Sequence, residues 1–216
     1  MNKINYRKKM LDIISSSGDR VPTLLLHACC APCLSSVLEQ LSPLFHVTVF
    51  FYNPNILPED EYQKRAAEVK RLLAEMPQKY PAQFIEGRYN VRQFLKIARG
   101  LEQEPEGGER CMGCYRLRLE ETAKYARAGG YDYFTTTLTV SPYKNAQKLN
   151  EIGAELAETY ETAYLPSDFK KNGGYQRSIE LSHVYGLYRQ DFCGCPYSEE
   201  FARRKRAARQ KDSRRI

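Results

Sequence analysis

The chain has 216 residues and a formal net charge of +7, and this length is sufficient for one domain with a full hydrophobic core. It has no run of about 18 apolar residues, so we expect no membrane span. Its first residues, MNKINYRKKMLDII, are charged throughout and lack the apolar centre of a signal peptide. We therefore expect a cytoplasmic protein with an N-terminal extension over 1–21, one α/β domain over 22–200 and a C-terminal tail over 201–216.

The positive charge lies in the tail. Residues 203–215 carry a net charge of +7, equal to that of the whole chain, so the remaining residues are balanced. Their basic side chains are Arg203, Arg204, Lys205, Arg206, Arg209, Lys211, Arg214 and Arg215. Such a run favours a polyanionic partner, and nucleic acid is the leading candidate. A solvated helix end without a partner is the alternative.

Hydrophobic patterning predicts strands that alternate with helices along the chain. The strands are expected at 23–28, 46–52 and 83–87, followed by helices at 31–41, 59–76 and 91–98 respectively. Residues 111–130 begin as a loop and continue as a helix, and 131–140 form a fourth strand. A loop and a helix follow over 141–160, an irregular segment comes next, and helical spacing returns over 178–190. This order predicts a mostly parallel sheet with helices on both faces.

Loops at one edge of this sheet carry the residues of chemical interest. Residues 27–33 follow the first strand, 53–58 follow the second, and 135–144 follow the fourth. In open parallel sheets, ligands bind beyond the carboxyl ends of the strands. Neither of the common glycine-rich nucleotide-binding motifs occurs, and HACCAPC fills the position after the first strand that a phosphate-binding loop would take. ATP chemistry is therefore not expected.

Seven cysteines form three tight groups: Cys29, Cys30 and Cys33; Cys111 and Cys114; Cys193 and Cys195. An odd number of cysteines in a chain of this length argues against a disulfide framework. A structural zinc site would use four thiolates and leave three unexplained. The grouping favours a redox-active or substrate-facing metal assembly, with one four-ligand centre and a second centre beside it. Adjacent Cys29 and Cys30 are expected to diverge and to serve different centres.

Six motifs together resemble the epoxyqueuosine reductases of the QueH family. They are HACCAPC (27–33), FYNPNILPEDEY (51–62), ERCMGCYRLRLEETA (109–123), TTTLTVSPYKN (135–145), DFKKNGGYQRSIELS (168–182) and LYRQDFCGCPYS (187–198). The resemblance implies a Rossmann-like sheet of the HUP type, a 4Fe-4S cluster and an additional mononuclear iron. It also implies removal of the epoxide oxygen from epoxyqueuosine at the tRNA wobble position, without cobalamin and with an external electron donor. A tRNA sulfur transferase of related fold and a zinc-stabilised RNA-binding module stay open as alternatives.

These expectations assign roles to individual residues. Cys30, Cys111, Cys114 and Cys193 are predicted to hold the cluster, and Cys29, Cys33 and Cys195 the separate iron with one position open. The proton donor is predicted to be Tyr143, His27 or a bound water. The residues expected to contact tRNA are Lys144, Arg177, Ser178, Arg203, Arg204, Lys205 and Arg206.

Overall fold

Four parallel strands form one sheet in the computed structural model, which describes residues 4–16, 18, 20–200 and 202–203. The strands are β1 (Thr23–His27), β2 (His46–Phe51), β3 (Gln83–Glu86) and β4 (Tyr133–Thr136), in the order β3-β2-β1-β4. The central strand β1 is parallel to both neighbours, and Leu25 is in register with Thr48 on one side and Phe134 on the other. Because β1 is covered on both faces, its three leucines are fully buried.

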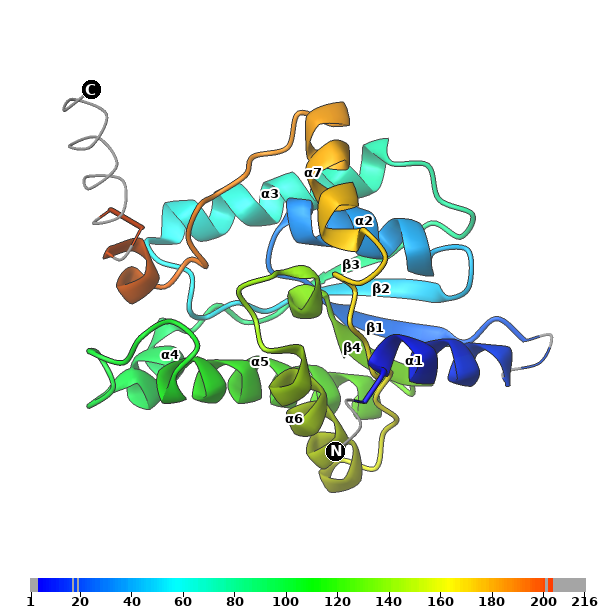
Figure 1. The fold of residues 1–216 in the computed structure, drawn as a ribbon, viewed down its shortest axis with the longest axis horizontal. Coiled ribbons are helices and arrows are strands. Elements are labelled where there is room, and N and C mark those ends of the chain that lie inside the picture. Colours follow the sequence, from blue (N-terminus) through cyan, green and yellow to red (C-terminus); the bar gives the residue numbers. More distant parts are fainter. Residues whose placement is uncertain (1–3, 17, 19, 201, 204–216) are drawn as a thin grey trace.

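Helices cover both faces of the sheet (Figure 1). The helices on one face are α2 (Ala31–Leu41), α3 (Glu59–Glu75) and α7 (Gly174–Val184), and α2 packs against both of the others. Those on the other face are α4 (Val91–Ala98), α5 (Glu109–Ala128) and α6 (Ala146–Thr159), where α5 contacts β1 and β4. This arrangement confirms the predicted α/β fold, and the strand order matches the first four strands of a Rossmann-type sheet.

Several predicted element boundaries differ from the structure, among them the end of α7, which lies at Val184 instead of residue 190. β4 ends at Thr136 instead of residue 140, because the Thr136 hydroxyl accepts from the backbone N–H of Leu138 and starts the short 3₁₀ helix Thr137–Val140. α7 begins at Gly174, earlier than predicted, after Gly173 turns the chain with φ +77°. α5 begins at Glu109, so Cys111 lies in a helix and not in a loop.

The N-terminal segment contains a helix that packs on the domain. This helix, α1 (Tyr6–Ser15), buries Met10 in the same hydrophobic core as α2 and α3. Asn5 caps it by accepting from the backbone N–H of Lys8. Across the part of the chain that the structure describes, no helix combines the length and the apolar character needed to span a bilayer.

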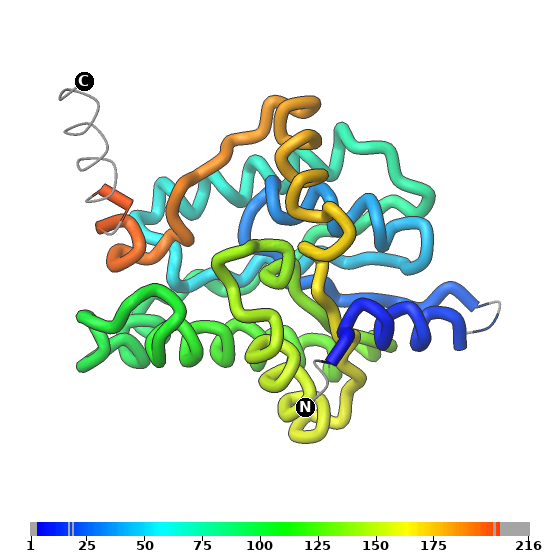
Figure 2. The backbone as a smooth tube through the Cα atoms, in the orientation of Figure 1, coloured from blue at the N-terminus to red at the C-terminus, as the bar shows by residue number. Residues whose placement is uncertain are grey.

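The segment that follows α7 runs along α3 toward the carboxyl edge of the sheet (Figure 2). Hydrogen bonds fix its path: the Tyr188 backbone N–H donates to Glu68 and its hydroxyl to Glu61, both on α3. Arg71 of the same helix donates to the backbone carbonyl of Tyr185. α3 therefore guides residues 185–195 to the edge where β1 and β2 end.

Candidate metal centre

The first cysteine group lies where β1 meets α2. Cys30 is the N-cap of α2 with extended backbone (φ −171°, ψ 159°), and Pro32 occupies the first turn, where its missing N–H costs no hydrogen bond. No side chain caps this helix end, so its free N–H groups and positive dipole end lie beside the thiols. A helix N-terminus of this kind favours the thiolate form of cysteine, which is the form that binds metal.

The three Sγ atoms of this group lie within 4.8 Å of one another, and those of Cys29 and Cys30 are 3.7 Å apart. The two neighbouring side chains therefore do not diverge as expected, because the chain changes direction into α2 at Cys30. Thiolates that share one tetrahedral ion lie about 3.8 Å apart when the metal–sulfur bonds are about 2.3 Å. Cys29, Cys30 and Cys33 thus fit one metal ion with three protein ligands. The predicted assignment of Cys30 to a different centre stays a prediction without geometric support.

The second group lies in the first turns of α5. Cys111 and Cys114 are three residues apart and therefore lie on the same side of the helix, and both are buried. The backbone N–H of Gly107 donates to the Cys111 sulfur at 3.3 Å. Like the first group, these thiols lie at the positive end of a helix.

The third group depends on a glycine and a buried arginine. The Sγ atoms of Cys193 and Cys195 are 3.6 Å apart on either side of Gly194, whose φ of +108° is a conformation that other residues rarely adopt. Arg65 of α3, 1% exposed, is paired with Glu61 and donates to the backbone carbonyls of Cys193 and Phe192. The backbone N–H of Ser198 donates to the Cys195 sulfur at 3.4 Å. α3 therefore holds this loop through a buried cation.

Packing brings the three groups together. Cys111 shares one hydrophobic cluster with Cys29 and Cys30, whereas Cys114 shares a second cluster with Cys195. A cavity of about 440 Å³ opens beside them and is lined by residues of the segments that follow β1, β4 and α7, together with single residues of α3 and α5. Its lining includes Cys29, Cys30, Cys33, Cys193, Arg65, Arg118, Tyr143, Lys144, Tyr175, Ser178, Arg189 and Gln190. The three cysteine groups therefore lie together at the carboxyl edge of the sheet, as predicted.

Hydrogen bonds and charges favour the thiolate form at Cys30 and Cys193, whereas the pKa values of Cys29, Cys33, Cys114 and Cys195 are raised. Hydrogen bonds from Cys29 and Cys33 hold the pKa of the Cys30 thiol well below its usual value, and the Arg65 guanidinium acts in the same direction. A hydrogen bond from Cys195, together with the ammonium of Lys144, likewise lowers the pKa of Cys193. Burial opposes the charge of Lys144, but Cys193, Tyr115 and Glu106 outweigh it and raise its pKa. A set of soft, partly ionised sulfur donors suits zinc, iron or an iron–sulfur cluster.

The predicted proton donors lie in different environments. Tyr143 lines the cavity and is 69% exposed, so its hydroxyl can reach a bound molecule. His27 is fully buried at the end of β1 and is not part of the cavity lining. Its ring nitrogens are hydrogen-bonded to Thr136 and to the Tyr52 carbonyl, and burial lowers its pKa to about 4. His27 therefore connects the ends of β1, β2 and β4 by hydrogen bonds, and it is not placed to transfer a proton to a ligand in the cavity.

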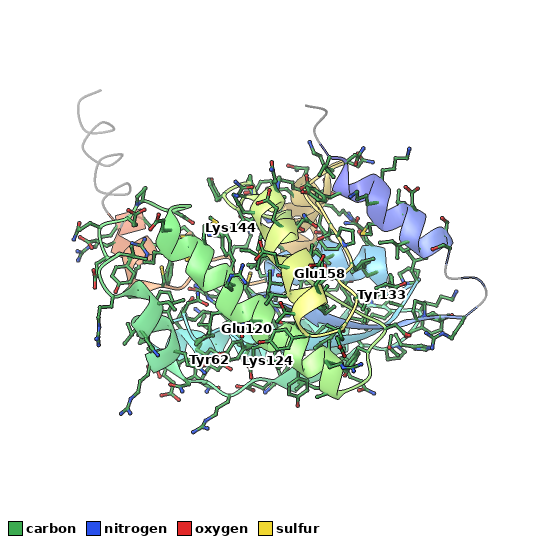
Figure 3. All side chains as sticks on the ribbon, turned by 90° about the horizontal axis from the view of Figure 1, so that it is seen from below. Tyr62, Glu120, Lys124, Tyr133, Lys144 and Glu158 are labelled. Carbon is green, nitrogen blue, oxygen red and sulfur yellow. The ribbon has the colours of Figure 1, made fainter. Side chains whose placement is uncertain are left out.

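The predicted tRNA contacts are also divided. Lys144, in the loop before α6 (Figure 3), and Ser178 line the cavity, and Lys144 is paired with Glu106 at 2.7 Å. Arg177 lies outside the cavity lining and is bound by Glu39 and Glu180. Arg203 is exposed at the end of the described chain. Arg204, Lys205 and Arg206 lie outside the described residues.

Sequence reasoning missed two arginines of the cavity lining, Arg65 and Arg118. Arg118 follows Cys114 by one helical turn, and this spacing was the only sequence signal for its position beside the thiols. Arg65 gave no signal, because its role depends on a contact with a loop 128 residues further along the chain.

Comparison with known proteins agrees with this geometry. The model of the family "Epoxyqueuosine reductase QueH" matches residues 24–201. This chain belongs to the QueH family. A QueH from Staphylococcus epidermidis is 46% identical over 203 residues, covering 91% of this chain and 85% of that protein. The QueH proteins of Streptococcus pyogenes and Thermotoga maritima are 44% and 37% identical, with 91% and 86% of this chain covered and 78% and 94% of theirs. As a QueH family member, the chain is an oxidoreductase, and it carries a cysteine cluster at the carboxyl edge of its parallel sheet.

Proposed function

We propose that this chain removes the epoxide oxygen from epoxyqueuosine at the wobble position of tRNA, using a 4Fe-4S cluster and an adjacent iron held by its seven cysteines. The observation that carries the proposal is the packing of three cysteine groups against one another, beside a cavity at the carboxyl edge of the sheet. The names of its relatives, all epoxyqueuosine reductases, supply the substrate. A tRNA substrate implies a cytoplasmic reaction.

The geometry suggests a division of the cysteines that differs from the one predicted from the sequence. Three thiols within 4.8 Å of one another suit the separate iron, which would keep a fourth position open for substrate. These are Cys29, Cys30 and Cys33. The remaining cysteines, Cys111, Cys114, Cys193 and Cys195, number four, which is the count that a 4Fe-4S cluster takes. Relative to the earlier division, Cys30 and Cys195 exchange places.

The reaction needs two electrons and two protons: the epoxide becomes an alkene and its oxygen leaves as water. When bound, the cluster and the iron would supply single electrons and a Lewis acid for the epoxide oxygen. An external donor must replenish the electrons. The cavity walls, built from Leu138, Val140 and Pro32 as well as polar groups, shield the reacting atoms from bulk water. The Tyr143 hydroxyl is the proposed donor of a proton to the departing oxygen.

The cavity also contains groups suited to a nucleotide. A wobble nucleotide lies in a single-stranded loop, so its base can enter a pocket without the cost of opening a duplex. Tyr143 and Tyr175 present aromatic rings at the cavity, and rings of this kind stack on bases. Arg189 is anchored by two uncharged acceptors, the Ser178 carbonyl and the Ser182 hydroxyl, so its charge is available for a phosphate. We therefore assign the phosphate contact to Arg189 in place of Arg177.

A turnover assay tests the function. The anaerobically purified, iron-loaded protein is mixed with dithionite and an anticodon stem–loop that carries epoxyqueuosine, and the nucleosides are analysed by mass spectrometry after digestion. The proposal predicts queuosine, with one oxygen fewer, in the complete reaction and none in a control without dithionite. An unchanged epoxide in the presence of fully loaded protein would refute it.

Two variants test the division of the cysteines. Cys30→Ala should lose the separate iron and keep the cluster spectrum, whereas Cys195→Ala should lose the cluster, because Cys195 shares a loop and a short Sγ–Sγ distance with Cys193. Iron and sulfide content and the visible spectrum measure both. The opposite pattern would restore the division made from the sequence.

A further inference from the structure

Arg118 is a cation buried beside the cysteines without a carboxylate to balance it. It is 4% exposed and lies one turn after Cys114 on α5. Its Nε donates to the Cys114 carbonyl at 3.3 Å, and none of the carboxylates in the described residues forms an ion pair with it. A buried charge is costly unless an opposite charge lies close by, so this guanidinium requires an anion.

The groups around Arg118 come from all three cysteine segments. It lines the cavity together with Cys29 from the β1 loop and Cys193 from the C-terminal loop. Cys114 lies one turn away on the helix of Arg118 itself. The neighbours able to balance its charge are therefore sulfur ligands.

The other buried arginine of the cavity differs in this respect. Arg65 has its own carboxylate, Glu61, at 2.7 Å, and its remaining donors bind backbone carbonyls of the Cys193 loop. Its charge is therefore largely neutralised within the protein. Of the two buried arginines that line the cavity, Arg118 is the one without a carboxylate partner in the described residues.

We propose that Arg118 is the counter-charge of the metal centre, a positioning residue that stabilises the negative charge of the thiolate-bound metals and raises their reduction potential. This proposal rests on the proposed function, because that function supplies the redox-active metals. Each electron taken up adds negative charge to the centre, so a fixed cation nearby favours the reduced state. Without the cation, the centre should be harder to reduce, and its thiolates should release metal faster.

Three variants separate charge from packing. Arg118→Gln removes the charge and keeps a polar side chain of intermediate length, whereas Arg118→Lys keeps the charge. Arg116→Gln is the matched control, because Arg116 lies on the same helix but is exposed and paired with Glu155. For each anaerobically loaded protein, the midpoint reduction potential is measured by redox titration, and the rate of iron release to a chelator is followed by absorbance.

We expect Arg118→Gln to lower the equilibrium constant for one-electron reduction of the centre about ten-fold. This corresponds to a midpoint reduction potential that is about 59 mV lower than in the wild type. Iron release from Arg118→Gln should be about ten-fold faster than from the wild type. If Arg118→Gln does not load iron at all while Arg118→Lys loads fully, that result also supports the proposal. Arg118→Lys and Arg116→Gln should stay close to the wild type. The proposal is overturned if Arg118→Gln matches the wild type in both measurements, or if Arg118→Lys is impaired as severely as Arg118→Gln. Wild-type protein without redox-active iron would overturn the proposed function first, and this inference with it.

Discussion

Replacing Gly194 with alanine should damage the metal centre through a collision that the structure locates. A Cβ atom at this position would lie 2.7 Å from Ile56 Cγ1 and 3.1 Å from an Arg65 nitrogen. Overpacking of this kind costs about 1–3 kcal/mol. The φ of +108° adds backbone strain of about 1–3 kcal/mol for a residue other than glycine. The free energy of unfolding should therefore fall by about 2–6 kcal/mol, and the loop can avoid this cost only by moving Cys193 and Cys195.

Gly100 provides a matched control for Gly194→Ala. Its φ of +79° is also unfavourable for alanine, but nothing lies within 4 Å of a Cβ atom built there. Gly100→Ala should therefore show the backbone strain alone, and its iron content should be normal. Urea denaturation of the loaded proteins measures the stability difference, and iron analysis measures retention. Equal stability and equal iron content in the two variants would refute the collision with Ile56 and Arg65.

The substrate-binding residues yield further predictions. Arg189→Gln should weaken tRNA binding and reduce the slope of log affinity against log salt concentration by about one unit. Arg177→Gln should change neither the affinity nor the slope, because Glu39 and Glu180 already bind Arg177. A slope that changes in Arg177→Gln alone would reverse the assignment. Tyr143→Phe should lower turnover by about 10²-fold or more and leave the iron content normal, because the exposed hydroxyl is placed to donate a proton. Normal turnover of this variant would mean that Tyr143 only stacks on the base. Deleting residues 203–215 should weaken tRNA binding and flatten its salt dependence, and an unchanged slope would mean that the tail is a solvated end.

The elements with strong local signals were predictable. Apolar runs and β-branched residues placed β1 and β2, and proline in the first turn together with helical spacing placed α2, because these signals depend only on neighbours in the sequence. β4 was predicted too long, because the side chain of Thr136 ends the strand through a local hydrogen bond that competes with strand pairing.

The site was predictable in its residue types and its place on the sheet, but not in its geometry. The cysteines could be counted and assigned to the carboxyl edge, since parallel strands end there together. The close approach of Cys29 and Cys30 could not be predicted, because it depends on the angle at which the chain enters α2. Contacts between distant parts of the chain also determine which arginines reach the cavity. Glu39 of α2 binds Arg177 on the outer surface, whereas the position of α5 brings Arg118 to the cavity.

Metal analysis of the anaerobically purified protein tests the central claim most directly. Iron and acid-labile sulfide are determined per chain, and the visible spectrum is recorded, for protein kept strictly anaerobic throughout purification. The account predicts about five irons and about four sulfides per chain, with the brown absorbance of a 4Fe-4S cluster. A colourless protein with zinc and no sulfide would contradict it, because zinc neither stores nor delivers the two electrons that removal of an epoxide oxygen requires.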